Sequence, residues 1–103
     1  MKKAYARAIP APWRRVAGIF VALGDPHRQR ILLMFERGER LNVGQIVAAS
    51  TLSRTAVSHH LRVLHEAGVL EREKIGKEVY FRPDAKAVRA ALDAVRDYLA
   101  AHC

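Results

Sequence analysis

The 103-residue sequence has a single cysteine and no long apolar run. Because a disulfide needs two cysteines, Cys103 excludes an internal disulfide, and its solitary presence fits the reducing cytoplasm. The longest apolar stretch, residues 16–23, contains a glycine and is far too short to span a bilayer. Residues 1–3 are not followed by an apolar segment with a small-residue cleavage site, so no signal peptide is predicted. We expect a cytoplasmic protein without a membrane association.

The signatures of common enzyme classes are also missing. The sequence has no nucleophile elbow, no Gly-rich phosphate loop and no paired carboxylates. Ser58 and His59 are adjacent in a segment that we predict to be helical, so their side chains point about 100° apart. That is poor geometry for a Ser–His hydrogen bond. We expect neither an enzymatic activity nor a cofactor.

Acidic residues are scarce relative to basic ones. Ten Asp and Glu stand against 18 Lys and Arg, which gives a net charge of +8, while half of the residues are apolar. The apolar half is enough for a packed core, and the excess of positive charge indicates a polyanionic partner. Charge alone does not separate specific nucleic-acid binding from incidental binding.

Glycine, proline and capping residues divide the first half of the chain. Residues 1–12 form an N-terminal arm, either a short helix or an irregular basic segment. Helical spacing of apolar residues predicts a helix from Trp13 that ends at Gly24. Asp25 followed by Pro26 predicts the start of a second helix, with apolar positions 31, 32, 34 and 35 and an end at Gly38.

The second half predicts two further helices, a hairpin and a closing helix. Asn42 can cap a short third helix, and Ser53 can cap a fourth that runs to Gly68. Residues 69–82 alternate with a period of two around a turn at 75–77, which predicts a two-stranded hairpin. Residues 84–102 form the last helix. The fold class is mainly α with a small β-hairpin wing, a winged helix-turn-helix in a single domain over 1–103.

The predicted fourth helix has two distinct faces. Val57, Leu61 and Leu64 form its apolar side, with His60 beside them. The polar side spans an arc of about 140° and carries only one acid, Glu66, near the far end of the helix. Hydroxyl, imidazole and guanidinium groups on that side are the groups that contact base edges and phosphates. The same pattern also occurs in amphipathic helices whose polar face is only solvated.

The hairpin that follows adds basic residues in the position of a wing, where they can touch phosphates. The predicted DNA-binding residues are Ser53, Arg54, Thr55, Ser58, His59, Arg62, His65, Arg72, Lys74 and Lys77.

These segments resemble the ArsR/SmtB family of repressors. The similarity covers residues 16–83 and rests on four segments: Leu-Gly-Asp-Pro-His-Arg-Gln-Arg-Ile-Leu at 23–32, Leu-Ser-Arg-Thr-Ala-Val-Ser-His-His-Leu-Arg-Val-Leu at 52–64, Glu-Ala-Gly-Val-Leu at 66–70, and Gly-Lys-Glu-Val-Tyr-Phe at 76–81. The resemblance implies a homodimer joined by its first and last helices, which represses transcription until an inducer binds. It also implies that Ser58 and His59 face the operator.

The metal-binding positions that the resemblance implies carry the wrong residues. Asn42 and Gly44 stand where the arsenic and cadmium sensors have thiolates, and neither can replace one for a soft metal. The zinc sensors have an Asp-x-His pair and a His-x-x-Glu pair in the last helix. Asp84 with Lys86 and Asp97 with Ala100 occupy these places. We predict no metal at either site, which leaves His102 and Cys103 as weak candidates, and a terminal cysteine is more often a bystander.

The first and last predicted helices are both amphipathic, and so short a chain gains stability from a second copy. The expected interface residues, which can also contribute to the core of one chain, are Trp13, Val16, Phe20, Val88, Leu92, Val95 and Leu99.

The sequence therefore predicts a homodimeric, sequence-specific regulator of transcription that binds double-stranded DNA and is released by an unknown inducer. Two alternatives stay open: a nucleoid-type protein that binds DNA without sequence preference, and a winged helix used for protein binding. The side chains of the fourth helix that can read base edges favour specific binding over the nucleoid-type alternative. The scarcity of exposed apolar groups on the fourth helix argues against the second.

Overall fold

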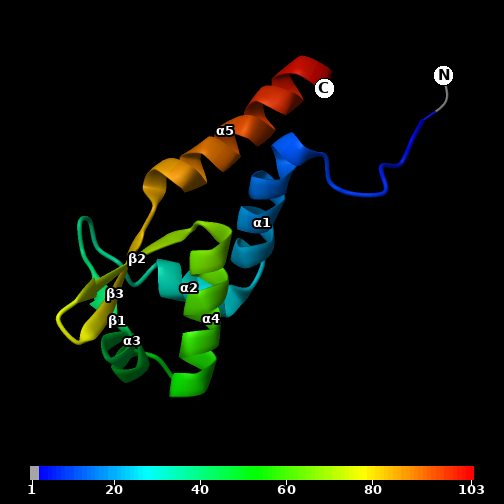
Figure 1. The fold of residues 1–103 in the computed structure, drawn as a ribbon. Helices are drawn as coiled ribbons and strands as arrows, with labels where there is room; N and C mark the ends of the chain where they lie inside the picture. Colours follow the sequence, from blue (N-terminus) through cyan, green and yellow to red (C-terminus); the bar gives the residue numbers. More distant parts are fainter. Residues whose placement is uncertain (1–2) are drawn as a thin grey trace.

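The computed structural model describes residues 3–103, which form six helices and one small sheet at the edge of the molecule (Figure 1). In chain order the elements are η1 (Ala11–Trp13), α1 (Arg14–Leu23), α2 (Pro26–Leu32), β1 (Leu41–Asn42), α3 (Val43–Ala49), α4 (Arg54–Ala67), β2 (Leu70–Ile75), β3 (Glu78–Pro83) and α5 (Ala85–His102). The strands are antiparallel in the order β1-β3-β2. This architecture confirms the predicted winged helix-turn-helix.

The predicted N-terminal arm has no regular helix over residues 3–10, and Met1 and Lys2 lie outside the described residues. The first turn is η1, where the Trp13 N–H donates to the carbonyl of Pro10. Helix α1 then ends at Gly24, as the sequence predicts.

Helix α2 begins as predicted but is shorter than expected. The Asp25 carboxylate accepts hydrogen bonds from the N–H groups of His27 and Arg28, and Pro26 is the first helical residue. The helix ends at Leu32 and not near Gly38, so that boundary was wrong. The N–H groups of Met34 and Phe35 bond to carbonyls three residues back, so the chain tightens into turns whose side chains still pack on the core.

Helix α3 starts at a capping box. The Asn42 side chain accepts from the Gln45 N–H, and the Gln45 side chain accepts from the Asn42 N–H, both at 2.8 Å. Leu41 and Asn42 also pair with Phe81 and Tyr80, which adds strand β1 to the hairpin. The expectation of a two-stranded sheet was therefore wrong, because two residues are too few to show alternation and their partners lie far along the chain.

Helix α4 and the hairpin follow the predicted boundaries. Ser53 caps α4 by accepting from the Ala56 N–H, and Gly68 ends the helix with φ +90°. A glycine is favoured there because a side chain strains the left-handed backbone. Gly76, with φ +62°, begins the turn between β2 and β3.

The core lies between α4, α1, α3 and the sheet. Its largest fully buried side chains are Ile19, Ile46, Leu61, Leu64, Leu70, Val57 and Val69. Three of these come from α4, which identifies that helix as the central element, buried on one side and free on the other.

Helix α5 extends away from this core beside α1 (Figure 1). Of its 18 residues, only Ala91 is fully buried. The radius of gyration is 16.2 Å, against about 13 Å for a compact chain of 100 residues. The molecule is elongated because both α5 and the N-terminal segment before η1 extend from the core (Figure 1). Within residues 3–103, no helix combines the length and apolarity that a membrane span requires.

Candidate nucleic-acid interface

The free side of α4 gathers five of the predicted contact residues in one surface. Val57, Leu61 and Leu64 fix the rotation of the helix by pointing into the core. The opposite side chains line a surface hollow of about 600 Å³ formed by Arg54, Thr55, Ser58, His59 and Arg62. All five are exposed, and none is acidic. The surface can therefore donate hydrogen bonds to base edges and phosphate oxygens.

Ser53 and His65, also predicted contacts, have additional intramolecular partners. The Ser53 hydroxyl accepts from the Ala56 N–H at 3.1 Å. The His65 ring is half-buried, and its Nδ1 lies 3.1 Å from the carbonyl oxygen of Leu70, so Nδ1 is the donor in this contact. These bonds place both side chains at the edge of the α4 surface.

The wing extends the same surface through Arg72. The register pairs Arg72 with Phe81 and Lys74 with Val79, and directly paired residues point to the same side of a sheet. Arg72 and Phe81 line a second hollow, of about 230 Å³, together with Ser58 and Arg62 of α4. One acid, Glu66, also borders it. Arg72 thus joins the hairpin to the helix, while Lys74 and the turn residue Lys77 are exposed farther out.

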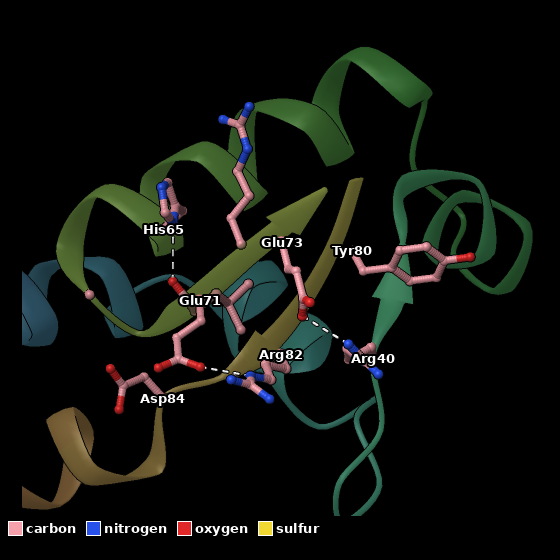
Figure 2. Close-up of a pocket in the computed structure, with 10 residues that line it drawn as sticks. Arg40, His65, Glu71, Glu73, Tyr80, Arg82 and Asp84 are labelled. Carbon is pink, nitrogen blue, oxygen red and sulfur yellow. Dashed lines mark hydrogen bonds and ion pairs between the residues drawn. The ribbon is translucent and has the colours of Figure 1, made fainter. Parts of the chain in front are cut away.

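On the other side of the wing, Glu71 and Glu73 are held in ion pairs, as Figure 2 shows. Glu71 accepts from Arg82 at 2.7 Å, and Glu73 accepts from Arg40 at 2.8 Å. The hydrogen bond to Glu71, with its negative charge, raises the pKa of the Arg82 guanidinium. Exposed pairs of this kind add little stability. Their consequence is electrostatic, because Glu71 and Glu73 face away from Arg72 and Lys74.

Arg40 was missed by the sequence analysis. It lies before β1, and only the pairing of β1 with β3 brings its Nη1 within 2.8 Å of the Glu73 carboxylate on β2. The available sequence signal for Arg40 was the strand that follows it, which begins at Leu41. That strand has only two residues, too few to show the alternation by which a strand is recognised.

The predicted interface residues divide into exposed and buried groups. Phe20, Leu92 and Leu99 are 42%, 53% and 52% exposed, whereas Val88 and Val95 are half-buried against the core. Val16 is only 9% exposed and belongs to the core of its own chain, which leaves little of its side chain for a partner. Trp13 is half-buried and packs edge-on against Tyr98, with ring centroids 5.5 Å apart. Val21 and Tyr98 of the same two helices are also exposed.

The metal positions of the family do not fit a metal in this chain. The Asn42 amide forms the capping box, and Gly44 has no side chain. The Asp84 carboxylate accepts from the Ala87 N–H as the cap of α5. At the end of α5, the His102 ring stacks on Tyr98 and Cys103 is exposed. Within residues 3–103, no three His, Cys, Asp or Glu side chains are grouped as ligands for a metal ion.

Comparison with known proteins identifies the family. Residues 25–72 match the model of the bacterial regulatory protein, arsR family. A transcriptional repressor SmtB homolog from Synechocystis sp. is 34% identical over 86 residues, which cover 84% of this chain and 64% of that protein. The match therefore spans less than two thirds of this relative.

Three solved structures share the fold. An ArsR-like transcriptional regulator from Rhodococcus sp. RHA1 superposes with a TM-score of 0.80 at 24% identity, covering 88% of this chain and 85% of that one. The homodimeric winged helix-turn-helix DNA-binding domain of a possible ArsR-family regulator from Mycobacterium bovis gives 0.70 at 24% identity, covering 98% and 93%. A solved possible transcriptional regulator for arsenical resistance is 30% identical, with a TM-score of 0.65, and the match covers 84% of this chain and 96% of that one. Together with the match over residues 25–72, this places the chain in the ArsR family of bacterial regulatory proteins, which are DNA-binding regulators of transcription.

Proposed function

We propose that this protein is a sequence-specific repressor that binds double-stranded DNA as a homodimer, with 1–103 acting as a single winged-helix domain. The observation that carries the proposal is the exposed surface without acidic residues that Arg54, Thr55, Ser58, His59 and Arg62 form on the free side of α4. A B-DNA major groove is about 12 Å wide and admits one α-helix. The 14 residues of α4 give a helix of about 21 Å, long enough to contact several base pairs.

Within this surface the residues have different roles. Ser58 and His59 offer a hydroxyl and an imidazole at the centre of α4, where they contact base edges. Arg62, Arg72, Lys74 and Lys77 contact phosphates, which position the protein but carry no sequence information directly. The net charge of +8 supports this division, since a dimer has twice that charge available for counterion release.

The homodimer is supported by the unpartnered side of α5. Only Ala91 of this helix is fully buried in one chain, and Leu92, Tyr98 and Leu99 are exposed on it. Phe20 and Val21 of α1 add further exposed apolar surface. The M. bovis regulator domain, which has the same fold, is homodimeric. A dimer also carries two α4 helices, which can each bind one half-site of the same operator.

The repressor role is supported by the Synechocystis relative, which is a transcriptional repressor. We propose that an inducer other than a metal at the two family sites releases the DNA, because Asn42, Gly44 and Lys86 cannot supply the missing ligands.

The test begins with selection of duplexes from a random pool, followed by binding curves for paired variants. The Ser58→Ala/His59→Ala double variant should lose about 1–3 kcal/mol of specific binding per lost base contact, with an unchanged melting temperature, since both side chains are exposed. Arg62→Ala and Lys77→Ala should weaken binding to the selected and random duplexes about equally.

The contrast between the double variant and the two single variants separates residues that read the base sequence from residues that contact phosphates. If the double variant is folded and binds the selected duplex as tightly as the wild type, α4 does not read the sequence. Equal affinity of the wild type for all duplexes would favour a nucleoid-type protein, and no affinity for DNA would favour a protein-binding module.

A further inference from the structure

The Arg28 side chain connects three elements near the start of α2. Its Nε donates to the carbonyl oxygen of Ala22 at 2.6 Å, and its Nη2 lies 3.4 Å from that of Val21. Its Nη1 lies 3.9 Å from the carboxylate of Asp25 and 3.4 Å from Nδ1 of His60. The side chain is only 14% exposed. Arg28 therefore links the last turn of α1, the cap of α2 and the middle of α4.

The contact with His60 determines which imidazole nitrogen carries the proton. A guanidinium only donates hydrogen bonds, so Nδ1 of His60 must accept, and the neutral ring carries its hydrogen on Nε2. An imidazolium has N–H groups at both nitrogens and cannot accept. The Arg28–His60 hydrogen bond therefore exists only when His60 is neutral.

The surroundings of His60 are rich in positive and titratable groups. From α2, His27 lies with its ring centroid 5.7 Å away, beside Arg28, and His59 of α4 lies at 5.6 Å. The Asp25 carboxylate is the one negative group acting on His60. Burial lowers the pKa of His60, and Arg28, His59 and His27 lower it further, against an opposing effect of Asp25.

Asp25 is largely committed to its own helix. Partial desolvation raises its pKa, but the hydrogen bonds from the N–H groups of Arg28 and His27, with the charge of Arg28, outweigh this, so the pKa is lowered overall. The carboxylate therefore stays ionised as the cap of α2 over the range in which His60 titrates, and it does not neutralise the whole cluster.

We propose that Arg28 and His60 form a proton-sensitive latch that positions the recognition helix α4 against the corner between α1 and α2. The latch is the Arg28–His60 hydrogen bond together with the bonds of Arg28 to the carbonyls of α1. Protonation of His60 removes the acceptor and places an imidazolium beside the guanidinium. Because His59 lies next to His60 on the DNA-facing side, a shift of α4 there displaces the contact surface. This inference rests on the proposed DNA binding.

The direction of the pH effect follows from the folded state's preference for neutral His60. The unfolded chain has a histidine pKa of about 6.5, and in the fold it is lower. The contribution of His60 to the free energy of unfolding is thus fully present above its pKa in the unfolded chain. It declines as the pH falls from that value through the lower pKa of His60 in the fold. The latch opens as the pH falls through the pKa of His60 in the fold. The part of the DNA affinity that depends on the latch is lost over the same pH range.

The test compares the wild type with His60→Asn, so that any pH effect that does not involve His60 is common to both proteins. An Asn side-chain oxygen can accept from Arg28 and does not titrate. Wild type and His60→Asn should bind the selected duplex within about twofold at pH 7.5. Between pH 7.5 and 5.0 the wild type should lose about 3- to 10-fold relative to His60→Asn, as expected for loss of one hydrogen bond.

Arg28→Met removes the N–H groups that donate to His60 and to the carbonyls of α1. Arg37→Met is the control, because it removes the same charge from an exposed arginine. In the Arg28→Met background, the His60→Asn change should no longer alter the pH response, whereas in the Arg37→Met background it should. Equal pH responses of wild type and His60→Asn overturn the proposal. If Arg28→Met does not fold, the wild type and His60→Asn comparison decides alone.

A measurement without DNA separates this inference from the proposed function. Long-range ¹H–¹⁵N NMR spectra of the histidine rings at pH 7.5 should find His60 with its hydrogen on Nε2, and Arg28→Met should raise its pKa. A hydrogen on Nδ1 overturns the latch even if DNA binding is specific. If the wild type binds no duplex, the proposed function fails, while the ring spectra still decide whether the contact exists.

Discussion

At the scale of single residues, polar side chains in this protein act first on the backbone beside them. Asp25, Asn42, Ser53 and Asp84 each accept an N–H from the first turn of the helix that follows. A helix leaves its first N–H groups without internal partners, so these caps fix where α2, α3, α4 and α5 begin. The cap at Ser53 fixes where α4 begins, while the burial of Val57, Leu61 and Leu64 sets which side chains lie on its free side.

The capping box of α3 yields a stability prediction. Asn42→Ala should lower the free energy of unfolding by about 0.5–2 kcal/mol, because it removes the acceptor for the Gln45 N–H. Gln45→Ala should cost less, since it leaves that acceptor in place. Thermal melts should show the difference as a shift of about 4–8 °C per kcal/mol. Unchanged melting of Asn42→Ala would show that the cap contributes nothing.

The metal positions yield a binding prediction at the same scale. The purified protein should hold neither zinc nor arsenite with submicromolar affinity, because Asn42, Gly44 and Lys86 cannot act as the needed ligands. Elemental analysis before and after a chelator tests this. Stoichiometric metal that survives the chelator would contradict it, and loss of that metal in Cys103→Ser would assign it to the chain end.

At the scale of elements, the hairpin separates its charges between two sides. Glu71 and Glu73 pair with Arg82 and Arg40 on one side, and Arg72 and Lys74 lie on the other, with Phe81. Successive residues of a strand point to opposite sides of the sheet. Acidic and basic residues alternate along β2, so the acids lie on one side and the bases on the other. The wing therefore presents a basic surface although its strands contain acids.

The wing predicts a change in salt dependence. Each phosphate contact contributes about 0.9 to the slope of log affinity against log salt concentration. Lys77→Gln, in the exposed turn, should reduce the slope by about 1. Lys86→Gln removes the same charge from α5 and should change it less. Equal slopes for these two variants would mean that the wing does not contact phosphates.

At the scale of the whole molecule, one chain leaves α5 poorly covered. The helix contacts α1 but leaves Leu92, Tyr98 and Leu99 exposed. Exposed apolar surface of this kind marks an interface. In the proposed homodimer a second copy covers this surface and sets the spacing of the two DNA-binding surfaces, so we expect dimerisation and operator recognition to depend on the same helix.

The dimer prediction uses two exposed leucines. Leu92→Glu should weaken dimerisation at least about 10-fold, because about 1.4 kcal/mol of desolvation cost suffices for that change. Leu33→Glu is the control, since Leu33 is 82% exposed at the end of α2. Sedimentation at micromolar concentration should find dimers of the wild type and the control, and monomers of Leu92→Glu. A monomeric wild type that binds DNA tightly would contradict the assignment.

The sequence by itself determined the features that depend on near neighbours. The caps, the left-handed glycine after α4 and the buried stripe of Val57, Leu61 and Leu64 follow from residues at most four positions apart. The exposed arc of α4 follows from the same periodicity, so the exposure of its residues was predictable one by one.

The tertiary structure decided the features that join distant segments. Strand β1 exists because Leu41 meets Phe81, Arg40 is paired because β1 places it beside Glu73, and Arg28 reaches His60 across 32 positions. Packing of Met34 and Phe35 likewise allowed α2 to end early. No local period encodes these contacts, because their free energy arises only when the core brings the segments together.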